Sequence, residues 1–132
     1  MLGWILAVLA LFVVQTLIAP TMRYYGGRGS AGEKINLALG SRDNPPPLPV
    51  EGERAQRALK NMFEALPVFL TLALLILIQD RDTTLAKSGA GIFFAARLAY
   101  VPSYMFGIYG VRTAFWLAGW AGLLLMLAAL LF

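Results

Sequence analysis

The chain has 132 residues, of which 59% are hydrophobic and 14% are charged. A soluble domain of this length has too small an interior to bury so much apolar surface, so the composition predicts an integral membrane protein. The formal net charge of +4 is compatible with binding to nucleic acid. The basic residues flank the apolar segments, however, which favours membrane orientation and anionic ligands, and we predict no nucleic-acid partner.

Cysteine and histidine are both absent from the sequence. Disulfides, a thiol nucleophile and thiolate metal sites are therefore excluded, together with the commonest general base and metal ligand. We predict no metal site. Any chemistry must come from charged or hydroxyl side chains, or from a cofactor that the protein binds.

The first predicted span covers residues 2–21, close to the about 20 residues that cross a bilayer. A cleaved signal peptide is the alternative, but no basic segment precedes the apolar run and no small-residue cleavage motif follows it, which favours a retained span. Gln15, inside this span, is expected to form an interhelical hydrogen bond rather than a ligand contact.

A polar connection, residues 22–52, follows the first span; glycine punctuates its start, and the PPPLP segment extends its end. Loops of this length in compact bundles are usually functional or partly disordered. Three further spans are predicted over residues 53–79, 85–109 and 113–132. Pro67 and Pro102 lie inside the second and third spans and are expected to bend them. The predicted fold is one all-α membrane domain, a bundle of four transmembrane helices over residues 1–132.

Four spans place both chain ends on the same side of the membrane. Eight basic residues lie in or beside the first and third connections, and two lie in the second. This asymmetry places the 22–52 connection in the cytoplasm and both termini outside it. The eight are Arg23, Arg28, Lys34, Arg42, Arg54, Arg57, Lys60 and Arg112, and the two are Arg81 and Lys87.

Polar side chains share one face at the start of the second span. At about 100° per residue, Arg54, Arg57, Asn61 and Glu64 fall within a sector of about 80°. For Arg54 alone, membrane orientation is the preferred explanation. For Arg57, Lys60 and Asn61 together with Arg112, a pocket for an anionic ligand competes with it, because guanidinium groups bind carboxylates in pairs of hydrogen bonds.

Two ionisable residues lie deep in predicted spans. Glu64 is about 11 residues into the second span and Arg97 about 12 into the third, and a charge at such depth needs a partner or water. We expect them to meet, or to share a polar cavity with Asn61. A purely structural ion pair is the open alternative. Tyr100 and Tyr104 follow Arg97 at helical spacing and share its face.

Three motifs then resemble one family. RALKNMFEALPVF (residues 57–69), the Arg-x-x-Tyr-x-x-x-Tyr pattern that starts at Arg97, and GVRT (residues 110–113) look like the MAPEG superfamily. These are the membrane-associated proteins in eicosanoid and glutathione metabolism, which include microsomal glutathione transferases, leukotriene C synthase and microsomal prostaglandin E synthase. The SRDNPPPLP loop resembles the bacterial branch, so the resemblance implies a bacterial inner-membrane protein.

The resemblance implies a homotrimer that binds glutathione between neighbouring subunits near the cytoplasmic face. It further implies a transferase or peroxidase that acts on lipophilic substrates from the surrounding lipid. Arg112 would stabilise the glutathione thiolate, with Tyr104 or Thr113 as a hydrogen-bond donor. The implied glutathione-binding residues are Arg23, Arg57, Lys60, Asn61, Glu64, Arg97 and Tyr100.

Two other functions stay open at this stage. A non-enzymatic scaffold, or an accessory subunit of a larger membrane complex, would keep the fold without the chemistry. A channel or transporter is least favoured, because the polar residues gather at one end of the spans and do not line a path through the membrane.

Overall fold

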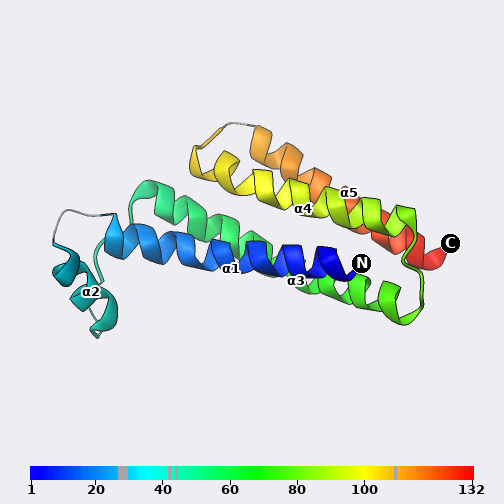
Figure 1. Ribbon diagram of the computed structural model, residues 1–132. Helices are drawn as coiled ribbons and strands as arrows, with labels where there is room; N and C mark the ends of the chain where they lie inside the picture. Colours follow the sequence, from blue (N-terminus) through cyan, green and yellow to red (C-terminus); the bar gives the residue numbers. More distant parts are fainter. Residues whose placement is uncertain (27–29, 42, 44, 109) are drawn as a thin grey trace.

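The structure is a computed structural model that describes residues 1–26, 30–41, 43, 45–108 and 110–132. The described residues form helices and no strands, as the composition predicts. Four long helices lie alongside one another, and a short fifth helix lies beyond one end of the bundle (Figure 1). In chain order they are α1 (Leu2–Tyr25), α2 (Ala31–Leu39), α3 (Val50–Ile78), α4 (Thr84–Met105) and α5 (Val111–Leu131).

Three of these helices, α1, α3 and α5, are long and apolar enough to cross a membrane among the residues that the structure describes. They confirm three of the four predicted spans. Helix α4 is long enough but less apolar, because it carries Lys87, Arg97 and several glycine and serine residues. Its own passage through the membrane stays a prediction. The predicted end of this span, Tyr109, lies outside the described residues, and the helix itself ends at Met105.

The connection between the first two spans contains more structure than its composition suggested. Helix α1 continues to Tyr25, and α2 occupies nine residues of the predicted connection. A capping box starts α2: the Glu33 N–H donates to the Ser30 hydroxyl at 3.3 Å, and the Ser30 N–H donates to the Glu33 carboxylate at 2.9 Å. Arg28 and Arg42, two of the basic residues counted for orientation, lie outside the described residues.

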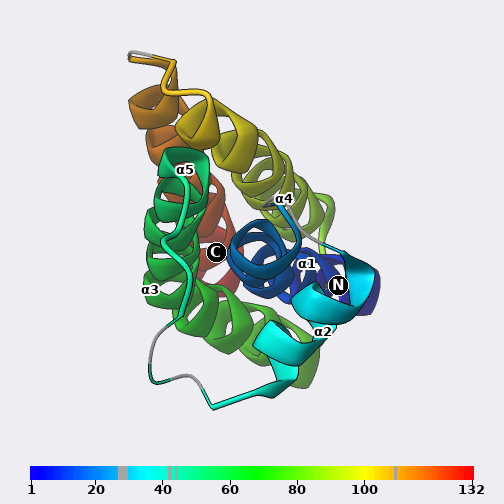
Figure 2. The same ribbon diagram turned by 90° about the vertical axis from the view of Figure 1, so that its left-hand side faces the viewer.

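The core is built from one face of each long helix. Figure 2 shows α1 flanked by α3 and α4, and α5 packs against both α3 and α4. At the centre the rings of Phe69 and Phe93 stack with their centroids 4.7 Å apart. Val8 and Met126 complete this buried layer from α1 and α5. The packing joins all four long helices around a single apolar core.

The two chain ends lie at the same end of the bundle, opposite α2 (Figure 1). There the Met1 ammonium group donates a hydrogen bond to the Asp82 carboxylate at 2.7 Å, and Lys87 lies 3.6 Å from the same oxygen. This hydrogen bond holds the pKa of the Asp82 carboxyl below its usual value. The ion pairs tie the start of α1 to the link between α3 and α4.

Gly122 permits the closest approach of α4 and α5, and we expect Gly122→Ala to destabilise the bundle. A Cβ at this position would lie 2.6 Å from the Gly89 carbonyl oxygen and 2.8 Å from the Phe93 nitrogen, so backbone would have to move. Overpacking of this kind costs about 1–3 kcal/mol. Thermal unfolding in detergent measures the loss of stability of the Gly122→Ala variant. Gly3→Ala is the matched control, because nothing lies within 4 Å of its Cβ; equal stability of the two variants would contradict the prediction.

Candidate functional site

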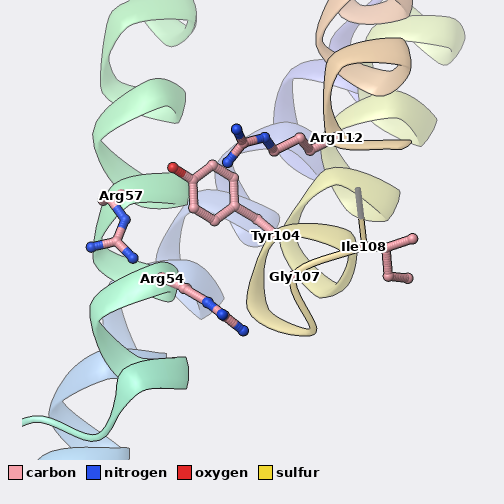
Figure 3. A pocket seen from close by; sticks show the side chains of 6 residues that line it. All are labelled: Arg54, Arg57, Tyr104, Gly107, Ile108 and Arg112. Carbon is pink, nitrogen blue, oxygen red and sulfur yellow. The ribbon is translucent and has the colours of Figure 1, made fainter. Parts of the chain in front are cut away.

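A pocket rich in arginine lies at the end of the bundle where α3 begins, α4 ends and α5 begins (Figure 3). Its volume is about 200 Å³. We call it the arginine pocket; its described lining residues are Arg54, Arg57, Tyr104, Gly107, Ile108 and Arg112. The three guanidinium groups come from the first turns of α3 and the first turn of α5.

The end of α4 fixes the position of Arg54. The last carbonyl groups of a helix lack intrahelical donors, and the Arg54 Nη1 group donates to the Met105 carbonyl oxygen at 3.1 Å. The chain then turns through Gly107, whose φ of +67° is strained for other residues. A Cβ there would also lie 2.9 Å from Arg54 Nη1. This glycine therefore gives the turn its shape and leaves room for the guanidinium.

Arg57 and Arg112 lie on either side of Tyr104. The Arg112 guanidinium carbon is 5.4 Å from the centroid of the Tyr104 ring, within cation–π range. Figure 3 shows Tyr104 reaching from α4 toward α3, with its hydroxyl directed to the side of Arg57. Arg57 has an exposed ion pair with Glu53 at 3.8 Å, one turn earlier, and such surface pairs hold a side chain only weakly. Arg57 is therefore available to a ligand.

The charge of the pocket defines what it attracts. Three of its described lining side chains are guanidinium groups and none of them is a carboxylate. Guanidinium groups bind carboxylate and phosphate groups through fixed pairs of donors, and their positive charge stabilises a nearby thiolate. The arrangement suits a ligand with more than one negative group, and Tyr104 adds a hydroxyl donor among them.

A line of polar and aromatic side chains connects this pocket to the core. Arg97 is 2% exposed, and its Nη1 group donates to the Asn61 side-chain oxygen. Its guanidinium carbon is 5.2 Å from the Phe93 ring centroid and 5.9 Å from that of Tyr100. The Tyr100 and Tyr104 ring centroids are 5.5 Å apart. We call Asn61, Arg97, Tyr100 and Tyr104 the inner polar line, which ends in the arginine pocket.

The family follows from comparison with known proteins. The family model described as the MAPEG family matches residues 1–132, the whole chain. The chain belongs to the MAPEG family. It is thus a membrane protein of the group related to eicosanoid and glutathione metabolism, as the three motifs predict.

One protein similar to part of this MAPEG protein is a component of eukaryotic translation initiation factor 3 from Neurospora crassa, which is 39% identical over 83 residues. The alignment covers 61% of this chain and 27% of that protein, so the chain spans about a quarter of its relative's length. No solved structure matches the chain.

Three of the predicted site residues of this MAPEG protein, Arg57, Tyr104 and Arg112, meet in the arginine pocket. Asn61, Arg97 and Tyr100 form the inner polar line that leads to it. Thr113 is exposed beside Arg112, outside the pocket lining. Arg23 lies elsewhere, in a separate pocket of about 300 Å³ with Tyr24 and Gln56.

Of the two expectations for Arg97, a direct meeting with Glu64 is wrong, and the contact with Asn61 is the one observed. Asn61, and not Glu64, takes its hydrogen bond, and the described residues give Glu64 no ion pair with Arg97. Glu64 and Lys60 are both exposed side chains of α3. The reason is angular: Arg97 approaches α3 on the side of Asn61, and Glu64 lies further around the helix.

Sequence reasoning missed Arg54 as a pocket residue and assigned it to orientation. The signal was present, because Arg54 lies three residues before Arg57 on the same helix face. Gly107 and Ile108 were also missed. Their place in the lining depends on the turn after α4. The glycine at position 107 predicts a turn, but it does not predict the direction in which the chain leaves it.

Proposed function

We propose that this protein is a membrane-embedded, glutathione-dependent transferase or peroxidase that acts on lipophilic electrophiles. The observation that carries the proposal is the arginine pocket: three guanidinium groups and the Tyr104 side chain line one cavity at one end of a bundle with membrane-capable helices. Glutathione carries two carboxylates and a thiol, which are the groups that such a pocket holds best as anions. Family membership supports the same ligand.

The chemistry needs no cysteine or histidine from the protein. A free thiol has a pKa near about 8.5 and is mostly protonated at neutral pH, and a nearby guanidinium lowers that value because it stabilises the anion. Arg112 takes this role in our proposal, with Tyr104, which lines the pocket, as the hydrogen-bond donor to the sulfur in preference to Thr113, which lies outside the lining. The thiolate sulfur then bonds to an electrophilic carbon of a substrate from the bilayer, which either releases a leaving group or takes up a proton. With a peroxide, the sulfur takes one oxygen as the O–O bond breaks and an alcohol leaves, and a second glutathione reduces the resulting sulfenic acid, which gives glutathione disulfide and water.

We further propose that the site is completed by a second copy of the chain, in a homotrimer. The pocket of one subunit holds about 200 Å³, below the roughly 300–1,000 Å³ of typical ligand sites. Lys60 and Glu64 are exposed on a membrane-capable helix, where a charge facing lipid is costly. A neighbouring subunit against this face of α3 would cover them, and we propose that the Arg23 of that subunit completes the glutathione site.

The proposed orientation places the arginine pocket on the cytoplasmic side. Arg23 and the start of α3 lie at the pocket end, and the chain ends lie at the opposite end of the bundle (Figure 1). The excess of basic residues at the pocket end supports this orientation. In a bacterium the membrane would then be the inner membrane, where glutathione in the cytoplasm reaches the pocket.

Subunit association provides a prediction for Glu64. If a neighbouring subunit covers this side chain, Glu64→Leu removes a polar contact between copies and shifts the protein toward smaller species in native mass spectrometry. If Glu64 faces lipid, the same change leaves the assembly intact and raises stability, because it removes a charge from hydrocarbon. Leu6→Ala, at an exposed position of α1, is the control that should leave the mass unchanged.

A calorimetric titration of the purified oligomer with glutathione tests the proposed function. We expect saturable binding by the wild type, about tenfold weaker binding by Arg57→Ala, and turnover of a lipophilic electrophile by the wild type. No binding by a protein of confirmed oligomer mass would reject the proposal. Binding without conjugation or peroxide reduction would favour the alternative, a non-enzymatic scaffold or accessory subunit of a larger membrane complex.

A further inference from the structure

An apolar groove between α1 and α4 lies apart from the arginine pocket. Its volume is about 470 Å³, within the usual range for small-molecule sites. Ala95 and Ala99 leave the space open, because they lie one turn apart on α4 and carry no bulk. The described lining residues are Leu11, Val14, Gln15, Ile18, Ala95, Leu98, Ala99, Val101 and Pro102.

Gln15 is the one polar side chain in this described lining. It is 4% exposed, and its side-chain oxygen has no hydrogen-bond partner among the described residues. The interhelical hydrogen bond predicted for Gln15 is therefore not made by this oxygen. A buried amide without a partner is costly, and such groups in native proteins usually meet water or a ligand.

The α4 wall of the groove offers a second acceptor. Pro102 has no backbone N–H, so the carbonyl of Leu98, one turn earlier, loses its ordinary helical donor. Both Leu98 and Pro102 line the groove. The groove thus offers an amide and a carbonyl acceptor within otherwise apolar walls, and none of its described lining side chains is charged.

We propose that this groove binds one lipophilic alcohol from the bilayer, with its hydrocarbon body between α1 and α4 and its hydroxyl on Gln15. A hydroxyl both donates and accepts, so it satisfies the glutamine amide in either orientation. A carboxylate or phosphate does not fit, because none of the described lining side chains is a cation that could balance its charge. Gln15 lies near the middle of α1, so the hydroxyl lies inside the hydrocarbon layer, where water does not compete for it. The site is independent of the proposed glutathione chemistry.

Photolabelling of the full-length protein in lipid discs tests the proposal. The probe is hexadecanol with a diazirine on its chain, and the matched probe is its methyl ether, which cannot donate a hydrogen bond. We expect the alcohol to label residues 11–18 and 95–102 about threefold more than the ether does. Unlabelled hexadecanol should compete, and hexadecane should not. Equal labelling by the two probes, or labelling spread evenly over all lipid-facing helices, overturns the proposal.

Two variants locate the hydrogen bond and the cavity separately. Gln15→Leu should remove the preference for the alcohol over the ether, and Ala99→Phe should remove labelling by both because it fills the groove. Val13→Leu, at an exposed position of α1 outside the lining, is the control and should label like the wild type. Unchanged labelling of Ala99→Phe also overturns the proposal. Native mass spectrometry checks the assembly of each variant, and the wild-type comparison of the two probes decides the matter if a variant does not assemble.

Discussion

Replacing Arg112 by alanine is expected to lower the rate of glutathione conjugation by about 100-fold at neutral pH. Arg112 brings a positive charge to the pocket beside Tyr104. The loss of one group that stabilises a reacting anion typically lowers the rate of an enzyme by about 100-fold. The effect should depend on pH. The wild-type rate rises as pH passes the lowered thiol pKa, whereas in Arg112→Ala it rises only near about pH 8.5, the pKa of a free thiol. The deficit should therefore shrink as the pH is raised.

Arg81→Ala is the matched control for this experiment. Arg81 lies in the link between α3 and α4, at the opposite end of the bundle from the arginine pocket. Its removal changes the net charge by the same amount and should leave both the rate and its pH profile unchanged. A rate in Arg112→Ala that falls equally at all pH values would contradict the assigned role, because it would indicate lost binding without a change in the thiol pKa.

Replacing Asn61 by leucine is expected to destabilise the folded protein by about 3 kcal/mol. Asn61 accepts the hydrogen bond from the Arg97 Nη1 group, while the Nε and Nη2 groups have no partner among the described residues. Without Asn61 the buried guanidinium lies against the Phe93 and Tyr100 rings with no hydrogen-bond acceptor among the described residues. An uncompensated buried charge costs several kcal/mol. Thermal unfolding in detergent measures the loss.

Arg97→Met distinguishes the loss of stability caused by an unpaired buried charge from the loss caused by removed side-chain volume. Methionine removes the guanidinium and keeps much of its volume, so this variant should be more stable than Asn61→Leu. The double variant should also be more stable than Asn61→Leu alone, because the unpaired charge is then gone. The prediction is contradicted if Asn61→Leu unfolds at the wild-type temperature, or if Arg97→Met is the less stable of the two single variants. Either result would mean that the hydrogen bond between Arg97 and Asn61 contributes little to stability.

Periodicity along the sequence predicts most of the helices and half of the pocket, for physical reasons. Apolar runs long enough to cross a bilayer define α1, α3 and α5, and the 3.6-residue repeat puts Arg54 and Arg57 on one face of α3. Arg97, Tyr100 and Tyr104 line up on α4 for the same reason, as their ring contacts confirm. These features depend on local geometry alone.

Other features depend on contacts between distant segments. The choice of Asn61 over Glu64 as the partner of Arg97 follows from the angle at which α4 meets α3, and spacing along one helix does not determine that angle. The meeting of Arg54 with the Met105 carbonyl depends on the turn at Gly107. Helix α2 could have been predicted, because Ser30 and Glu33 have the spacing of a capping box. The glycine and proline residues around this segment are typical of a loop, and they favoured the prediction of a connection without a helix.

We propose that the arginine pocket holds glutathione as its thiolate, and an ultraviolet difference spectrum of the wild-type oligomer would reveal that anion. At saturating glutathione and neutral pH, we predict a thiolate absorption band in the wild type and no band in Arg112→Ala, with equal oligomer mass for both. A wild-type oligomer that binds glutathione and shows no thiolate band would contradict the claim.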